Sequence, residues 1–277
     1  MSEEPFEVSI AGGSLRGHRG GSGPPALLLH GGAAVPDYLD SLAAELGGLF
    51  STYRYTQRGT PPSSGGPPFT VETHMADALA VLDKFGVDRG WAVGHSWGGH
   101  LALHLLVSHP ERLLGVVAID TLGAFASVFP EQDPNLRRGL SPGQVARLDE
   151  IEAKRLAGDV SEAELVERFA LIWPQFFFDP SRAIPPPARA GAEASIGVNR
   201  SLGEHFERGT LAERLPAAEL PVLFLHGAQS AMPVGSTIET GALVPEAEVV
   251  VVPDCGHFPW IEQPGSVRSA VESFLAR

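Results

Sequence analysis

The sequence of 277 residues contains a single cysteine, Cys255, so no disulfide can form within the chain. A lone thiol fits a reducing compartment better than an oxidising one. Cys255 stands two residues before His257, which suggests a reactive thiol, but we favour the interpretation that it is a small buried side chain. The cysteine content therefore gives no sign of a disulfide-stabilised fold.

Long hydrophobic runs are also absent. No apolar stretch reaches the roughly 20 residues that a helix needs to cross a bilayer. The acidic N-terminus, residues 1–4, is not followed by an unbroken apolar segment, so it does not resemble a secretory signal. We therefore expect a cytoplasmic protein with no membrane partner.

Basic residues are scarce. The chain has 20 Lys and Arg against 33 Asp and Glu, which gives a formal net charge of -13. Nucleic acids and anionic membranes need basic patches, so this charge argues against both. Phosphate-loop and dinucleotide-binding patterns are absent, so no cofactor is implied. The expected partner is a small-molecule substrate, and nothing in the sequence specifies an oligomeric state.

Apolar residues, 43% of the chain, are arranged as alternating strands and helices. A chain of this length can bury roughly three quarters of its unfolded surface in one core. The alternation predicts an α/β fold with a parallel sheet covered by helices on both faces. The expected strands are 6–10, 14–19, 26–29, 50–55, 91–93, 114–119, 221–225 and 248–252; the clearest helices are 37–49, 70–85 and 266–275.

Residues 121–215 interrupt this alternation of strands and helices. They contain helical, charge-dotted segments at 144–156 and 161–173, followed by an aromatic cluster at 173–178. No strand pattern occurs there. We therefore expect a mostly helical insertion in this region rather than a linker.

The stretch Gly94-His95-Ser96-Trp97-Gly98 lies between a buried strand and a helical pattern. This is the context of a nucleophile elbow, in which a serine sits on a sharp turn from strand to helix. The chain doubles back within two residues, so the flanking glycines supply the space. The alternative is a purely structural one, a glycine-rich turn in which the serine has no catalytic role.

Together, His30-Gly31-Gly32, the elbow at Ser96 and Gly256-His257 resemble the motifs of the α/β-hydrolase family. The resemblance covers almost the whole chain. It implies an eight-stranded, mostly parallel sheet with a helical cap inserted after the sixth strand. The core would then comprise residues 1–120 and 216–277, and the cap residues 121–215.

Within that family, Tyr55-Thr56-Gln57-Arg58-Gly59 and the elbow are similar to the proline iminopeptidase branch. That branch usually has Asp at the position of Thr56 and Gly at that of Pro61. Its cap carries an acidic, amine-binding motif after a tryptophan, whereas Trp173 here is followed by Pro174-Gln175-Phe176.

The resemblance also assigns roles. Ser96 would be the nucleophile, and His257, on the loop after the last strand, the base that activates it. The backbone N–H groups of Gly32 and Trp97 would stabilise the oxyanion. For His30 we favour a role in stabilising its loop.

The third member of the triad departs from the common pattern, because Ser230 stands where relatives usually have an aspartate. We expect Asp120, at the end of the strand after the elbow helix, to be the acid. The structural alternative is that Asp120 only forms a turn at the end of the strand. Asp254 is a second candidate for the acid, and a Ser–His dyad or a damaged site remains a third possibility.

Two histidines, His100 and His104, have the i, i+4 spacing of metal ligands on a helix. No glutamate of a His-Glu-x-x-His motif lies between them, so we favour a structural role and expect no metal site.

These features predict a cofactor-independent serine hydrolase that cleaves a small or medium ester, lactone or amide through an acyl-enzyme. The aromatic cluster at 173–178 favours an apolar acyl or alcohol portion. The alternatives are a proline iminopeptidase-like aminopeptidase, a lyase or cyclase on the same scaffold, and a ligand-binding member without activity.

Overall fold

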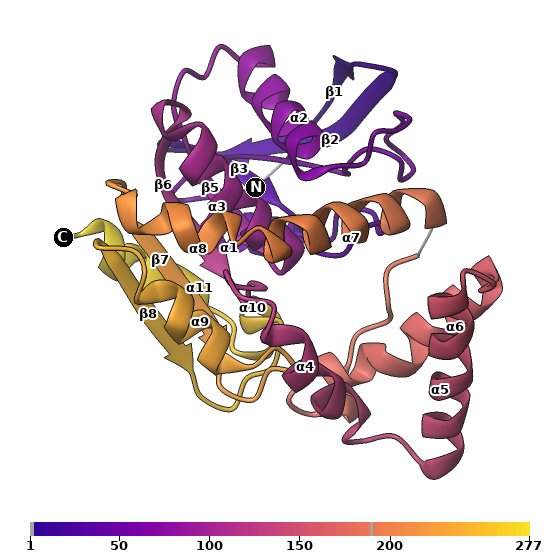
Figure 1. The fold of residues 1–277 in the computed structure, drawn as a ribbon. Coiled ribbons are helices and arrows are strands. Elements are labelled where there is room, and N and C mark those ends of the chain that lie inside the picture. The colour runs from indigo at the N-terminus through magenta and orange to yellow at the C-terminus, as the bar shows by residue number, and fades with distance from the viewer. Residues whose placement is uncertain (1–2, 189–190) are drawn as a thin grey trace.

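The computed structural model describes residues 3–188 and 191–277, which build one eight-stranded sheet (Figure 1). The strand order is β1-β2-β4-β3-β5-β6-β7-β8. β1, β2 and β4 pair antiparallel, and all the other neighbours pair parallel. The strands are β1 (Glu4–Ile10), β2 (Gly13–Gly21), β3 (Pro25–Leu29), β4 (Ser51–Tyr55), β5 (Gly90–His95), β6 (Leu113–Ile119), β7 (Val222–Gly227) and β8 (Ala247–Val252).

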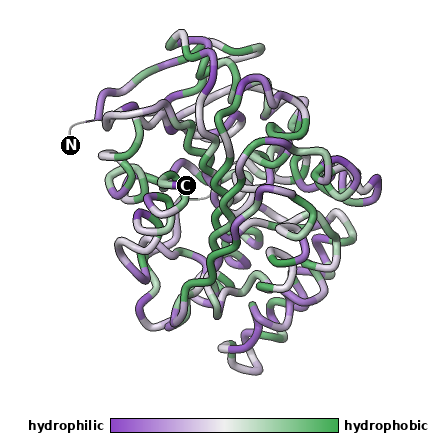
Figure 2. Tube along the Cα trace, turned by 90° about the vertical axis from the view of Figure 1, so that its left-hand side faces the viewer, coloured by the Kyte–Doolittle hydropathy of each residue, from purple (hydrophilic) through white to green (hydrophobic). Residues whose placement is uncertain are grey.

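Side chains of the central strands alternate between two hydrophobic layers, because successive residues of a strand point to opposite faces. In β3, Leu27 packs in the layer with α2 (Val71–Lys84) and α3 (Trp97–Ser108), whereas Leu28 packs with α1 (Asp40–Leu46) and α11 (Ser266–Leu275). Figure 2 shows these strands as a hydrophobic band through the middle of the molecule. Burial on both faces explains why the strands are continuously apolar in sequence.

The segment after β6 is helical, as predicted. In Figure 1, α4, α5 and α6 form a group to one side of the sheet, and α7 leads from this group back to α8 and the start of β7. These cap helices are α4 (Val128–Arg137), α5 (Pro142–Ala157), α6 (Glu162–Ile172), α7 (Ala192–Glu207) and α8 (Thr210–Arg214); α9 (Val234–Gly241) and α10 (Pro259–Glu262) follow β7 and β8. The eight-stranded, mostly parallel sheet with a helical cap after the sixth strand is therefore the architecture that the sequence predicts.

Local hydrogen bonds define where several helices begin. Thr70 caps α2 by accepting from the N–H of Thr73, as its position in the sequence suggests. The helix expected from residue 37 begins only at Asp40, because Asp37 accepts from the N–H of Leu39 and also pairs with Arg54. Among the described residues, no helix is both long and apolar enough to span a membrane.

A buried ion pair fixes the loop between β4 and α2. The guanidinium of Arg58 donates two hydrogen bonds of 2.6 Å to Asp77 on α2, and a third of 3.1 Å to the carbonyl of Gly66. Both charged side chains are 3% exposed, so solvent cannot compensate either charge if its partner is lost. This pair therefore holds the proline-rich loop against the core.

We expect Asp77→Ala to lower the free energy of unfolding by about 3–5 kcal/mol, because it leaves the Arg58 charge buried without a partner. Urea denaturation measures this. The control is Glu204→Ala, which breaks an exposed pair with Arg208 and should cost below about 0.5 kcal/mol. Equal effects of the two substitutions would contradict the role of the buried pair.

Candidate active site

Ser96 occupies a strained turn at the junction of β5 and α3. Its φ is 55° and its ψ is -120°, a backbone conformation that residues other than glycine rarely adopt. Its N–H donates to the carbonyl of Ile119 at 2.9 Å, which ties the turn to the end of β6. A Cβ on Gly94 would lie 2.1 Å from the carbonyl oxygen of Gly98, so the turn has no room for a larger residue. The predicted nucleophile is thus held at the carboxyl edge of the sheet.

The predicted base and acid meet at the same edge. Nδ1–H of His257 donates to Oδ1 of Asp120 at 2.6 Å. Asp120 directly follows β6, has a φ of 45° and is fully buried. Because Nδ1 carries the proton in this bond, Nε2 of His257 is left as the acceptor, which is the form that a general base requires.

Ser230, at the position where relatives usually have the acid, supports Asp120 instead. Its hydroxyl donates to Oδ1 of Asp120 at 2.6 Å, and the N–H of Gly227 donates to Oδ2 at 2.9 Å. Burial by itself raises the pKa of Asp120, but attraction to His226 and His257 and the hydrogen bonds from His257 and Ser230 outweigh it. The net shift is downward, so the carboxylate is charged at neutral pH.

Asp254 and Cys255 play no comparable part in the described contacts. Asp254 is exposed, and the hydrogen bond recorded for it uses its backbone carbonyl, which accepts from Gln263. Cys255 is fully buried, and burial raises the pKa of its thiol. A buried thiol of raised pKa is a poor nucleophile, which fits a packing role.

The loop of residues 30–32 lies directly against the elbow. A Cβ on Gly31 would be 2.6 Å from Cβ of Ser96, and Gly32 has a φ of 67°. Trp97 is the first residue of α3, where a backbone N–H has no partner within the helix. The two predicted oxyanion donors, Gly32 and Trp97, therefore belong to the two segments that flank Ser96.

Hydrogen bonds join these two segments through Gln57. Its amide donates to the carbonyl of His30 at 2.8 Å and accepts from the indole of Trp97 at 2.9 Å. Nδ1–H of His30 donates to the carbonyl of Gly31, and its Nε2 accepts from the N–H of Gln57. These bonds are consistent with the loop-stabilising role favoured for His30.

A second chain of hydrogen bonds runs from this loop to the base. The N–H of Gly31 donates to the hydroxyl of Tyr38 at 2.9 Å, and that hydroxyl donates to Nδ1 of His95 at 2.7 Å. Nε2–H of His95 then donates to the carbonyl of His257 at 2.8 Å. Burial lowers the pKa of His95, so its ring stays neutral and can both accept and donate. Nothing in the local sequence around Tyr38 or His95 indicates these bonds.

The helix beneath the elbow holds His100 and His104 in contact with each other. Nδ1–H of His100 donates to the carbonyl of Gly123 at 2.9 Å, and the two Nε2 atoms are 3.2 Å apart. Burial lowers the pKa of both rings, to about 3 for His100. Within the described ranges, no three His, Cys, Asp or Glu side chains are grouped as metal ligands.

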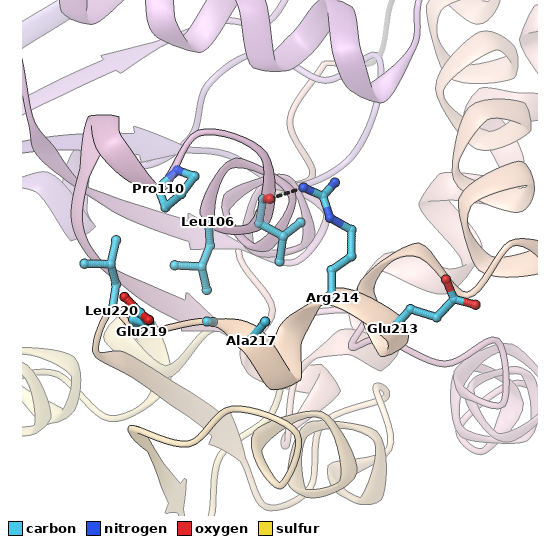
Figure 3. A pocket seen from close by; sticks show the side chains of 9 residues that line it. Leu106, Pro110, Glu213, Arg214, Ala217, Glu219 and Leu220 are labelled. Atoms are coloured by element: carbon cyan, nitrogen blue, oxygen red, sulfur yellow. Dashed lines mark hydrogen bonds between the residues drawn. The ribbon is translucent and has the colours of Figure 1, made fainter.

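One cavity, of about 530 Å³, lies away from Ser96, between the end of α3 and α8 (Figure 3). Leu106 and Pro110 face it from one side and Ala217 from the other. Arg214 at its rim already donates to the carbonyl of Val107. Arg214, the cationic side chain that lines this cavity, is therefore already bound. The cavity lies near the amino ends of β6 and β7, at the edge of the sheet opposite Ser96.

Comparison with known proteins identifies the family to which this fold belongs. Residues 24–264 match the family model described as the alpha/beta hydrolase fold. The chain belongs to the α/β-hydrolase family. It is 28% identical to a 2-hydroxymuconate semialdehyde hydrolase of Pseudomonas putida, over 98% of this chain and 93% of that protein. It is 24% identical to a proline iminopeptidase of Lactobacillus delbrueckii subsp. bulgaricus, over 91% and 89%.

Among solved structures, a thermophilic esterase from Thermogutta terrifontis superimposes with a TM-score of 0.68 at 22% identity. The match covers 99% of this chain and 98% of the esterase. At that identity the likeness concerns the fold. The match to the family model and the similarity to the semialdehyde hydrolase support an enzyme of the hydrolase class for this α/β-hydrolase.

We expect Asp120→Asn to lower kcat by about 10⁴-fold, because the base loses the anion that fixes its tautomer and stabilises its protonated form. Asp254→Asn is the matched control and should leave kcat near the native value. The measurement is the steady-state hydrolysis of an aryl ester by both variants. Near-native turnover by Asp120→Asn would show that another group is the acid.

Tyr38→Phe should leave the N–H of Gly31 without its acceptor and Nδ1 of His95 without its donor. Each lost partner of a buried polar group costs about 1–3 kcal/mol, so we expect a lower free energy of unfolding and a lower kcat. Urea denaturation and ester kinetics measure the two effects. Tyr53→Phe, on β4, is the control; if both variants behave alike, the hydrogen-bond chain has no such role.

Proposed function

We propose that this protein is a cofactor-independent serine hydrolase that cleaves a small or medium ester, lactone or amide through an acyl-enzyme on Ser96. The observation that carries the proposal is the 2.6 Å hydrogen bond between His257 and the buried Asp120, next to the strained turn of Ser96. This combination supplies a nucleophile position, a base of defined tautomer and an anion to support it.

In the proposed reaction, Nε2 of His257 takes the proton of the Ser96 hydroxyl as its oxygen attacks the substrate carbonyl. The N–H groups of Gly32 and Trp97 stabilise the resulting oxyanion, and the positive end of α3 adds to this effect. His257 then protonates the leaving alcohol or amine. Water, deprotonated by His257, attacks the acyl-enzyme and releases the acid and Ser96.

The cap favours a substrate with an apolar portion near the base. The ring of Phe176 lies 5.0 Å from that of His257, measured between centroids, and is only half-buried. Trp173 and Phe177, from the same aromatic cluster, are buried in the core beside Phe258. Phe176 is therefore the member of the cluster best placed to contact an acyl or alcohol group.

A proline iminopeptidase-like activity is a second candidate, because the chain is similar to such enzymes over most of its length. The segment after Trp173 argues against it. The chain continues as a short 3₁₀ helix, Trp173–Phe176, which has no carboxylate to bind a substrate amine. Cleavage of a prolyl amide faster than an aryl ester would favour this candidate.

The test is a panel of short aryl esters, lactones and prolyl amides, run with the wild-type protein and with Ser96→Ala. We expect ester or lactone hydrolysis by the wild type and a loss of about 10⁶-fold in kcat for Ser96→Ala. A fluorophosphonate should label the wild type at Ser96 and leave the variant unlabelled. Undiminished activity of Ser96→Ala would overturn the proposal.

A further inference from the structure

Glu262, at the end of the short helix α10, turns its side chain back over the loop that carries His257. Its Oε1 accepts from the N–H of Gly256 at 3.0 Å and from the N–H of Phe258 at 3.3 Å. These two residues flank the predicted base. A single carboxylate oxygen therefore binds the backbone on both sides of His257.

The other oxygen of Glu262 reaches the cap. Oε2 accepts from the N–H of Phe178 at 2.7 Å. Two residues earlier, the carbonyl of Phe176 accepts from the N–H of His257 itself at 2.7 Å. The backbone N–H groups of residues 256, 257 and 258 are thus all bound, either by Glu262 or by the cap segment that Glu262 also binds.

The contact between the two segments is close. A Cβ on Gly256 would lie 2.5 Å from the carbonyl oxygen of Phe176, 2.6 Å from the nitrogen of Phe178 and 2.8 Å from Oε1 of Glu262. All three hydrogen bonds described for the Glu262 carboxylate come from backbone N–H groups. The carboxylate is therefore held by backbone N–H donors, which fix its position relative to the loop and the cap.

We propose that Glu262 is a positioning residue for His257: its carboxylate ties the histidine loop to the cap segment 176–178 and so holds the imidazole toward Ser96. The inference rests on the proposed function of Ser96 and His257. Two acceptor oxygens serve three donors. Glutamine offers one acceptor oxygen and an NH₂ group, so in Glu262→Gln at least one backbone N–H faces another donor.

The kinetic test compares Glu262→Gln and Glu262→Asp with the wild type on an ester that the wild type cleaves. A displacement of about 1 Å in a reacting group can cost about 100-fold, so we expect kcat of Glu262→Gln to fall by up to that factor while KM changes little. Glu262→Asp keeps both acceptor oxygens and should recover part of kcat. Glu219→Gln, exposed at the opposite edge of the sheet, is the control and should have native kinetics.

The second readout is the downfield proton NMR signal of Nδ1–H of His257, which reports its hydrogen bond to Asp120. It should be sharp in the wild type and in Ser96→Ala, and shifted or broadened in Glu262→Gln. This signal does not require turnover, so it tests Glu262 even if Ser96→Ala shows that the proposed reaction is wrong.

Two results would overturn the role of Glu262. One is a native kcat in Glu262→Gln. The other is a lower kcat with an unchanged His257 signal, which would place the effect elsewhere in the fold. If Glu262→Gln does not fold, Glu262→Met, of similar length and without a carboxylate, takes its place, and a native kcat and signal in that variant would overturn the role equally.

Discussion

The fully buried carboxylate of Asp120 is the interaction on which the rest of the site depends. It lies at the end of β6, binds the N–H of Gly227 at the end of β7, and accepts from His257 on the loop after β8. An uncompensated charge in this position would be costly, so the protein surrounds it with donors. The hydrogen bonds that stabilise the buried charge of Asp120 include the one that positions the imidazole of His257. Loss of Asp120 would therefore affect both the stability of the fold and the geometry of the candidate site.

This arrangement explains how the site is built without an acid after β7. Ser230 stands at that position and points its hydroxyl at the carboxylate that comes from β6. Adjacent parallel strands end at the same edge of the sheet, so an acid at the end of β6, as proposed for Asp120, lies within reach of the histidine loop as one at the end of β7 would. The serine thus occupies the position after β7 and supports the proposed acid, Asp120.

Much of this could be predicted from the sequence, because its signals are local. Apolar strands alternating with helices indicate the sheet, and the glycines around Ser96 indicate the elbow. The bonds of Tyr38, His95 and Glu262 could not be predicted in this way. Several of them join residues far apart in the chain, such as Tyr38 with His95 and Glu262 with Phe178, and each is an ordinary residue in its local context. The helix α9 could not be predicted either, since Val234–Gly241 is short and rich in Gly, Ser and Thr.

The contact of Phe176 and Phe178 with the histidine loop divides the cap into two parts with different freedom to change. The backbone groups of Phe176 and Phe178 are bound to His257, the proposed base, and to Glu262. By contrast, α5 and α6 are joined by ion pairs and by a small apolar cluster that also contains Leu136 and Ala231. Sequence divergence, or a graft from another enzyme, can therefore change the outer faces of α5 and α6 as long as their buried side chains still pack. An exchange of the whole insertion must preserve the backbone path at 176–178, or it will disturb the chemistry along with the substrate range.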